Sequence, residues 1–288
     1  MLDFTETFYF IHDFCKAFEK WWDEKLLIHG TKKRRRQSKL HLSEITTILI
    51  EYHKSGFKCF KDYYRYVTCH HRKDFINLIS YDRFVTLVKR ALPAVVMLLE
   101  SLRGEITDIL FADATPYKVC HHKRGYRHKV FGDLACKSKS TMGWFYGLKL
   151  HFIFNKYGEI VRVLVTPANL DDRKGLNFMT KGIIGKIFAD KGYLGKDFFK
   201  ELFERGAHVV TGIKKNMKNI LMNLWDKVYL RKRGNVETIF SSIKSCGTFE
   251  HSRHRNVENA FCHIFTALIA YQLRPNKPAF FNKTEALT

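Results

Sequence analysis

The sequence predicts an α/β protein in which a mixed sheet follows an all-helical N-terminal region. Apolar residues recur at three- and four-residue steps over roughly the first hundred positions, and alternation typical of strands begins near residue 105. Helical patterns then return between later strands. With 288 residues the chain is long enough for two domains. We expect a helical domain over 1–104, an α/β domain over 105–275 and a tail over 276–288.

The composition favours a polyanionic partner. The chain carries 50 Lys and Arg against 28 Asp and Glu, a net charge of +22, while 45% apolar residues exclude a disordered polyelectrolyte. Nucleic acid is the leading candidate, with membrane surfaces and solubilising charge as alternatives. No apolar stretch approaches the roughly 20 residues that span a bilayer, and the start lacks a signal peptide pattern. We therefore expect a cytoplasmic protein with no membrane association.

The first helix is predicted from an aromatic pattern. Phe10, Phe14, Phe18, Trp21 and Trp22 recur at helical steps and predict one apolar stripe. The run TKKRRRQSK follows, with six basic residues among nine. A run of this charge does not pack, so we interpret it as a solvated arm or linker.

Two further helices are predicted around a glycine-containing break. One begins at Leu42 with Ser43 as its N-cap and ends at 54–56, and FKCFKDYYRYV forms the next. The pair resembles a helix-turn-helix that reads DNA, but any helical bundle gives the same pattern, so both interpretations stay open. A longer helix over Tyr81–Leu102 contains Pro93, which predicts a kink or a boundary between two helices.

The strand pattern starts with a three-stranded meander. ITDILFAD is a short apolar run that ends at Asp113, with Thr115 and Pro116 closing it. WFYGLKLHFIFN alternates in polarity, Asn155–Gly158 supplies a turn, and EIVRVLVTP returns as the third strand. The basic insertion CHHKRGYRHKVFGDLACKSKS separates the first two strands.

Strands and helices alternate in the rest of the domain. DDRKGLNFMTKG predicts a short helix, GKIFAD a fourth strand, GKDFFKELFERG a helix ended by Gly206, and HVVTGI a fifth strand before further helices. The order βββαβαβα predicts a mixed sheet with helices on its faces.

Three acidic residues occupy positions that favour chemistry over packing. Asp113 ends the first strand, Asp190 ends the fourth, and Glu237 lies in the helix of RGNVETIFSSIKS. The carboxylates of neighbouring strand ends can meet at one edge of a sheet, with Glu237 projected over it. Three close carboxylates repel one another unless cations lie between them, and Mg²⁺ prefers such oxygen ligands. We therefore predict a Mg²⁺ site.

Two cations flank Glu237 at helical spacing. Arg233 precedes it by four residues and Lys244 follows it by seven, which places all three on one helix face. Such a face suits a phosphodiester, with Arg233 and Lys244 holding the phosphates beside the metal ions. Two ordinary exposed ion pairs would give the same spacing, so this alternative stays open.

Other polar residues are interpreted as structural. Asp171 and Asp172 follow the third strand and could ligate a metal ion, but we interpret them as the start of a helix, where acids in the first turn are favourable. The histidines are predicted to contact phosphate or to pack, because a metal-bound water needs no histidine base; they are His128, His151, His251 and His254.

A family resemblance rests on nine stretches in order. They are LSEITTILIEYHKSGFKCFKDYY, LISYDRF, DATPYKVCHHKR, HKVFGDLACKSKSTMGWFYGLKLHFI, TPANLDDRK, FADKGY, IKKNMKN, LRKRGNVETIFSSIK and EHSRHRN. The chain resembles the DDE transposases of bacterial insertion sequences, most closely the insertion-sequence family numbered 982. The resemblance implies an RNase H-like catalytic domain with Asp113, Asp190 and Glu237 as the metal-binding triad. Of the Tyr-x2-Arg-x3-Glu-x6-Lys signature of wider transposases, Leu230 occupies the tyrosine position, with Tyr229 beside it.

The implied activity is DNA transposition. Two Mg²⁺ ions, with Mn²⁺ as a substitute, would activate water to cut strands at the terminal inverted repeats, and the freed 3′ hydroxyl would attack target DNA. Synapsis of two ends implies a homodimer or larger assembly. The alternatives are a nuclease or resolvase without strand transfer, and a non-catalytic DNA-binding protein, which leaves the three acids unexplained. Besides Arg233 and Lys244, the predicted phosphate contacts are Lys32, Lys33, Arg34, Arg35, Arg36, Lys123, Arg124, Lys137, Lys139, Lys214, Lys215 and Lys218.

Overall fold

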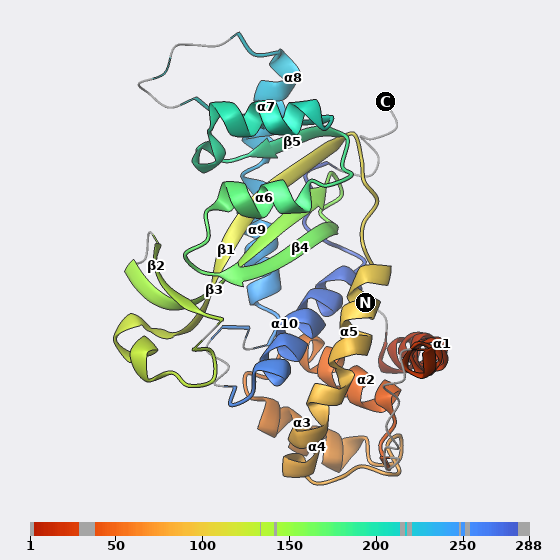
Figure 1. Ribbon diagram of the computed structural model, residues 1–288. Coiled ribbons are helices and arrows are strands. Elements are labelled where there is room, and N and C mark those ends of the chain that lie inside the picture. Colours follow the sequence, from red (N-terminus) through yellow and green to blue (C-terminus); the bar gives the residue numbers. More distant parts are fainter. Residues whose placement is uncertain are drawn as a thin grey trace. The chain divides into compact units, whose positions relative to one another are not determined.

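The chain forms two compact units, seen in the computed structural model of Figure 1. The structure describes residues 3–28, 38–132, 134–140, 143–213, 217, 221–247, 249–250 and 254–281. One unit comprises Met1–Leu102 and Ile243–Pro275, and the other comprises Arg103–Ser242 and Asn276–Thr288. We expected one α/β domain over 105–275, whereas the structure groups 243–275 with the helices. None of the helices in the described ranges is long and apolar enough to cross a membrane.

The helical unit is built around its last helix. It contains α1 (Phe4–Ile28), α2 (Leu42–Lys54), α3 (Phe60–His70), α4 (Tyr81–Val88), α5 (Leu92–Ser101) and α10 (Val257–Gln272). Helix α10 is buried over most of its length and packs against α2 and α5. This packing places residues 257–272 with the N-terminal helices. The sequence pattern did not indicate it, because a helix that is buried on all sides shows no apolar stripe of 3.6-residue period.

Two predictions for α1 and α2 were wrong in part or in full. In α1 the buried positions include Ile11, Cys15 and Phe18, while Phe10 and Trp21 are 40% exposed, so the predicted stripe was partly wrong. The N-cap of α2 is His41, whose N–H donates to the Glu44 carboxylate at 2.6 Å, so Ser43 as N-cap was wrong.

The boundary predicted from Pro93 is confirmed. Helix α4 ends at Val88, a 3₁₀ turn (η1, Lys89–Ala91) follows, and Pro93 lies in the first turn of α5. Proline is favourable there because the first N–H groups of a helix have no partner within it.

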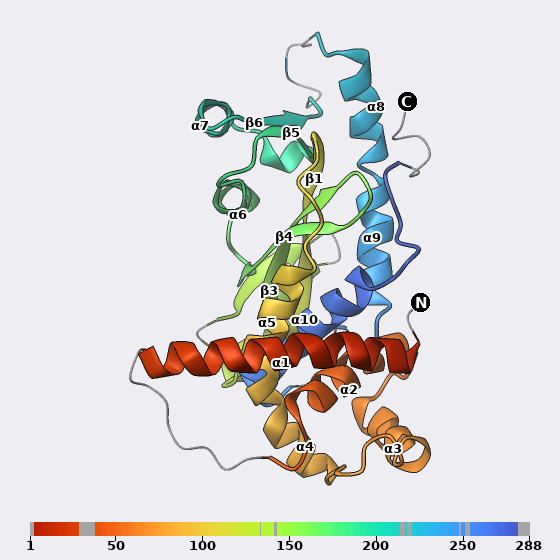
Figure 2. The same ribbon diagram turned by 90° about the vertical axis from the view of Figure 1, so that its right-hand side faces the viewer.

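The second unit contains a mixed sheet of six strands. These are β1 (Ile109–His121), β2 (Cys136–Ser140), β3 (Gly143–Asn155), β4 (Ile160–Pro167), β5 (Gly185–Ala189) and β6 (Ala207–Thr211). Strand β3 is antiparallel to β1, β2 and β4, while β1, β5 and β6 run parallel. Figure 2 shows α6 (Asp172–Met179) and α7 (Lys196–Glu204) on one face, with α8 (Leu224–Lys232) and α9 (Asn235–Lys244) on the other. The predicted mixed sheet with helices is confirmed.

Two features of the sheet differ from the prediction. Strand β2 lies inside the basic insertion and adds a sixth strand. Strand β1 does not end at Asp113 but continues through Pro116 to His121, paired with β3. Strand β5 pairs with β1 only over Ile109–Phe111. Beyond Phe111 this edge of β1 has no partner strand among the described residues, and a proline is tolerated on such an edge.

Each face of the sheet has its own apolar core. Leu110, Ala112 and Ile187 pack with Leu176 of α6 and Leu202 of α7. On the opposite face the side chains are aromatic: Phe152 and Phe154 contact Phe240 of α9, and Phe111 contacts Phe188. The alternation of side chains along β1 and β3 divides the residues between these two cores.

The segment after the last helix completes the aromatic core. The Phe280 ring stacks on Phe111 with 3.7 Å between ring centres, and its N–H donates to the carbonyl of Lys156 at 3.2 Å. The backbone of Pro278 lies so close to Gly158 that a Cβ there would clash, and Gly158 has φ +75°. Residues 276–281, predicted to be a tail, are therefore part of the second unit.

Replacing Phe280 by alanine is expected to lower the free energy of unfolding by about 3–5 kcal/mol, because this ring is 3% exposed and its removal leaves a cavity. Thermal and denaturant unfolding measure the loss. Phe203→Ala is the matched control, since that ring is 66% exposed. A change below about 1 kcal/mol for Phe280→Ala would contradict the packing described here.

Candidate active site

Two carboxylates meet where β1 and β5 separate. Phe111 of β1 pairs with Phe188 of β5 in parallel register. Asp113 lies two residues after Phe111, within β1. Asp190 lies two residues after Phe188; it follows β5 and is the N-cap residue of the short 3₁₀ turn η3 (Lys191–Tyr193). Equal steps along parallel strands keep them level. The register of the sheet thus positions Asp113 beside Asp190.

A single guanidinium bridges the two carboxylates. Arg233 lies 3.0 Å from Asp113 through Nη1 and 3.4 Å from Asp190 through Nη2. The Arg233 and Asp113 side chains are 20% and 21% exposed, whereas Asp190 is 55% exposed. We predicted Arg233 as a phosphate contact; in the structure its charge compensates two aspartates that would otherwise repel each other.

Burial is the main cause of the shifted pKa of the Asp113 carboxyl. The pKa of this carboxyl is raised to about 6, mainly by burial and in smaller part by the charges of Asp190 and Asp172. The N–H of Ala114, which donates to Asp113 at 2.8 Å, and the charge of Arg233 act in the opposite direction. The net increase shows that one guanidinium does not fully offset the cost of a charged Asp113 in this place.

A further carboxylate borders the pair. Asp172, in the first turn of α6, forms an ion pair of 2.9 Å with Lys149 of β3. Burial, followed by the charges of Asp113, Asp172 and Asp190, raises the pKa of Tyr193 well above its ordinary value. Lys149 and Tyr193 were not predicted as site residues, although the buried Tyr193 ends the FADKGY stretch.

The neighbouring acid and histidine have structural roles. Asp171 caps α6 by accepting the N–H of Arg173 at 2.9 Å, which confirms the predicted helix start. His151 is fully buried in β3, close enough to Gly175 that a Cβ there would lie 2.7 Å from its ring. Burial lowers the pKa of His151 to about 4, so the ring is neutral near pH 7 and packs instead of binding phosphate.

Glu237 does not take part in the Arg233 bridge between the two aspartates. It lies exposed in the first turn of α9, and none of the described side chains forms an ion pair or hydrogen bond with its carboxylate. Helix α8 ends at Lys232, and Arg233 and Gly234 separate it from α9, so the predicted continuous helix face is interrupted. Lys244 pairs with Glu250 at 2.8 Å. In the described ranges no group of three His, Cys, Asp or Glu is placed to hold a metal ion.

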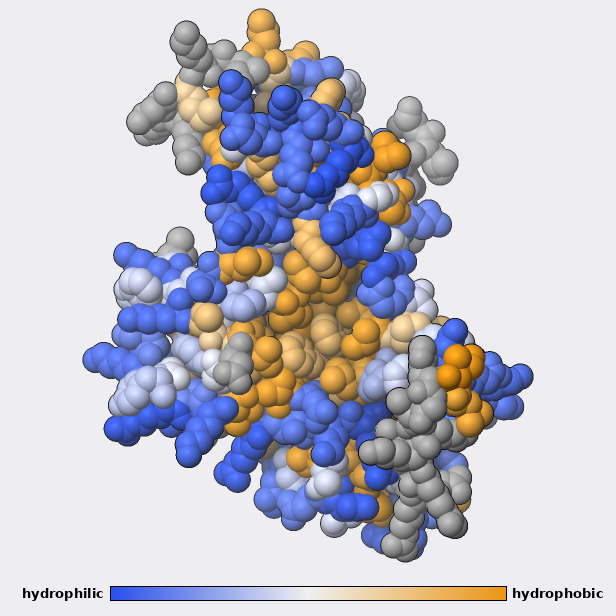
Figure 3. Space-filling view, viewed as in Figure 1, coloured by the Kyte–Doolittle hydropathy of each residue, from blue (hydrophilic) through white to orange (hydrophobic). Residues whose placement is uncertain are grey.

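The predicted phosphate contacts of the insertion lie on the surface. Lys123 and Arg124 are exposed on η2 (His122–Arg127), and Lys137 and Lys139 are exposed on β2. Figure 3 shows mostly hydrophilic side chains over β2 and η2. The other predicted contacts fall outside the described residues; these are Lys32, Lys33, Arg34, Arg35, Arg36, Lys214, Lys215 and Lys218, and His251 falls there too.

Tyr229, which stands beside the tyrosine position of the transposase signature, belongs to the aromatic core. Its ring contacts Phe188 of β5 at 5.3 Å and Phe281 at 5.5 Å between ring centres. Trp225 stacks on it one turn earlier in α8. These contacts fix α8 against the sheet and hence support the position of Arg233 at its end.

Comparisons with known proteins identify the family. No curated protein matches the chain. Among solved structures, one similar chain belongs to a "Cryo-EM structure of piggyBac transposase synaptic complex with hairpin DNA", with a TM-score of 0.48 and 11% identity, covering 88% of this chain and 70% of that one. The family model described as "Transposase DDE domain" matches residues 103–257, more than half of the chain. The chain therefore belongs to the family of transposase DDE domain proteins.

Proposed function

We propose that this transposase binds the terminal inverted repeats of an insertion sequence, cuts DNA strands at a centre formed by Asp113, Asp190 and Glu237, and joins the 3′ ends to target DNA. The observation that carries the proposal is the convergence of Asp113 and Asp190 on one cation at the ends of adjacent parallel strands. Packing alone gives no reason for a basic chain to place two aspartates side by side at these strand ends.

We assign the second unit to the RNase H-like folds. Its strand order supports this: with β2 set aside, the sheet runs β4-β3-β1-β5-β6, an antiparallel meander followed by two parallel strands. The matched family domain begins at residue 103, close to the start of this unit.

The carboxylates suit a hard divalent cation. Asp113 and Asp190 already share one positive charge, and the raised pKa of Asp113, caused mainly by burial and then by the neighbouring acids, means that a further cation would favour its charged form. Together with Glu237 they would hold Mg²⁺, for which Mn²⁺ would substitute. When bound, two such ions supply neutralisation of phosphate charge and a water of lowered pKa.

The chain's own cations would position the DNA. Arg233 lies directly beside Asp113 and Asp190, the residues that would hold the metal ions. Its guanidinium would therefore be placed to bind, through two N–H groups, a phosphate next to the bond that is cut. The exposed cations of the insertion would hold flanking phosphates, together with the basic run over 32–36; they are Lys123, Arg124, Lys137 and Lys139. Joining of two ends would require at least a dimer.

Binding to end DNA is expected to weaken steeply with salt, because each neutralised phosphate contributes about 0.9 to the slope of log affinity against log salt. The double change Lys137→Glu with Lys139→Glu should reduce that slope by about 2. Fluorescence anisotropy at several salt concentrations measures it. Lys196→Glu with Lys200→Glu on α7 is the charge-matched control. A slope near zero for the unchanged protein would contradict the proposal.

Cutting and joining are tested with the DNA ends of the element that encodes this chain. Labelled end DNA is incubated with the protein and a target plasmid, with Mg²⁺ or with a chelator. The proposal predicts nicked ends and joined products only with Mg²⁺. Cutting without joining would instead favour the nuclease or resolvase alternative.

A further inference from the structure

The helical unit contains a cavity that the proposed cutting centre does not use. It has a volume of about 740 Å³ and is lined by residues of α2, α3, α4 and α10 and of the segments before α3 and α10, all within this unit. We propose that it binds an unpaired nucleotide of the DNA, with the base inside the cavity and the neighbouring phosphates at its rim. This inference rests on the proposed function in that it takes DNA as the partner.

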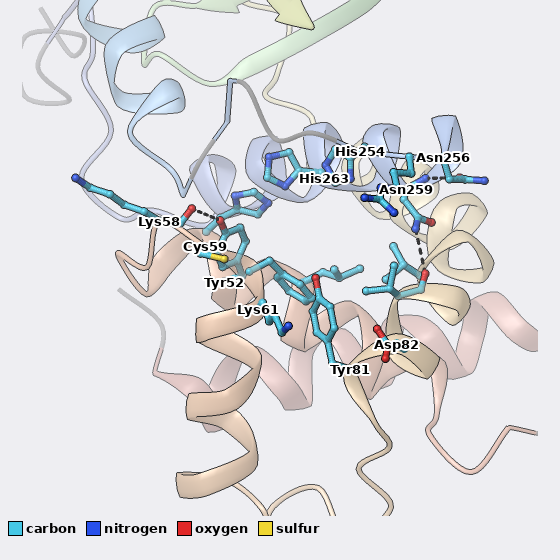
Figure 4. A pocket seen from close by; sticks show the side chains of 16 residues that line it. Tyr52, Lys58, Cys59, Lys61, Tyr81, Asp82, His254, Asn256, Asn259 and His263 are labelled. Atoms are coloured by element: carbon cyan, nitrogen blue, oxygen red, sulfur yellow. Dashed lines mark hydrogen bonds between the residues drawn. The ribbon is translucent and has the colours of Figure 1, made fainter. Parts of the chain in front are cut away.

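The inner walls suit a nucleobase. Phe60 and Tyr81 lie 6.3 Å apart between ring centres and are both half-buried, and Val85 and Val88 add apolar surface. In Figure 4 Tyr52 and Tyr81 lie on one side of the cavity, facing His254 and Asn259 on the other. Stacking on aromatic side chains contributes about 1–3 kcal/mol per base and tolerates every base.

Two buried polar atoms in the wall have no hydrogen-bond partner among the described residues. They are Oδ1 of Asn259 and Nε2 of His254. The Asn259 amide is fixed in orientation, because its Nδ2 donates to the carbonyl of Val85 at 3.0 Å, so Oδ1 is left as an acceptor. Burial and the nearby His263 lower the pKa of His254 to about 3, which keeps this ring neutral. Such unpartnered polar atoms favour a ligand that carries hydrogen-bond donors and acceptors along one edge, as a nucleobase does.

The rim of the cavity favours an anion. Lys58, Lys61 and Arg255 are exposed cations of the lining, against the single acid Asp82 in it. Lys61 lies 5.8 Å from the centre of the Tyr81 ring, so a phosphate bound by it would adjoin a base stacked on that ring. Cationic rim, aromatic wall and hydrogen-bonding edge together match a nucleotide.

A metal ion fits this place less well. The rings of His53, His254 and His263 cluster, with 4.7 and 4.9 Å between neighbouring ring centres. The described part of the chain nevertheless contains no group of three or more His, Cys, Asp or Glu residues arranged for metal binding. Both ring nitrogens of His53 are also engaged, one by the carbonyl of Cys246 and the other by Thr266.

The test compares two single strands that differ only in their bases. The full chain is titrated, by fluorescence anisotropy at one salt concentration, with a labelled twelve-nucleotide oligodeoxyadenylate and with a twelve-unit abasic strand of equal phosphate count. The unchanged protein is expected to bind the adenylate at least about tenfold more tightly. Val85→Phe, which fills the cavity, and Tyr81→Ala, which removes its wall, should bring the ratio near one while affinity for the abasic strand persists.

Controls separate the outcomes. Tyr9→Ala removes a tyrosine of the same unit that is 63% exposed on α1, and it should keep the full ratio. Thermal melting shows whether each variant is folded, and Val85→Phe carries the test if Tyr81→Ala is not. Equal binding of both strands, or a ratio that survives in both cavity variants, would overturn the inference. Salt-dependent duplex binding without base discrimination would overturn the cavity assignment alone, whereas no binding to any DNA would overturn the proposed function as well.

Discussion

Asp113→Asn is expected to stabilise the metal-free protein while reducing strand cleavage by several orders of magnitude. The side chain keeps its shape, and its amide oxygen can still accept the N–H of Ala114. The raised pKa of about 6, against an ordinary 3.8, means that ionisation of Asp113 costs about 3 kcal/mol in the folded protein. Removing the charge removes this cost, but it also removes a ligand that the cutting centre requires.

The stabilisation should depend on pH in a defined direction. Between pH 3.8 and about 6 the folded state binds the proton of Asp113 more tightly than the unfolded state, so the free energy of unfolding falls as the pH rises through this window. The difference in melting temperature between variant and unchanged protein should therefore be largest above pH 6 and vanish below about pH 4. Melting curves in the presence of a chelator measure it. Asp171→Asn is the control, and a less stable Asp113→Asn at pH 8 would contradict this account.

Arg233→Ala is expected to have the opposite effect on stability and the same effect on cleavage. Without the guanidinium, Asp113 and Asp190 face each other uncompensated, and we expect a loss of about 1–3 kcal/mol at pH 8. The loss should shrink as the pH falls and Asp113 takes up its proton. Cleavage should fall because no bidentate cation remains beside the cut.

Arg233→Lys separates charge from geometry. A single ammonium cannot reproduce the two contacts of the fork, so this variant should recover part of the stability but little cleavage. Combining Arg233→Ala with Asp113→Asn should cost less stability than Arg233→Ala alone, since the repelling pair is gone. Arg231→Ala, on the exposed surface of α8, is the control. Additive effects of the Arg233 and Asp113 changes would show that the bridge is not energetically important.

Strand and helix periods in the sequence were sufficient to predict most of the second unit. The meander, the turn at Gly158 and the helices α6 and α7 follow from local patterns, which a half-buried element displays directly. The course of β1 beyond Asp113 did not follow, because Thr115 and Pro116 are local signs of a strand end. Pairing with β3 along its full length overrides them.

Long-range packing accounts for the other differences. Helix α10 joins the N-terminal helices, and Phe280 enters the aromatic core of the sheet, although neither partner is close in sequence. The apolar run PAFF at 278–281 indicated a buried segment, although residues 276–288 were predicted to be a tail. In the site, the position of both aspartates directly after apolar runs was enough to anticipate that they could meet at one edge of the sheet. The bridging role of Arg233 depends on where α8 ends, which spacing along the chain does not specify.

The most direct test of the three-carboxylate centre compares Glu237→Gln with Asp172→Asn. Asp172 already acts on Asp113 through its charge, whereas Glu237 is exposed on α9, so the two are rival third carboxylates. Cleavage of end DNA is measured in Mg²⁺ for both variants, with melting temperatures to show that each is folded. Our account predicts that Glu237→Gln loses cleavage by several orders of magnitude and that Asp172→Asn retains most of it. Near-normal cleavage by Glu237→Gln, together with loss in Asp172→Asn, would contradict the assignment.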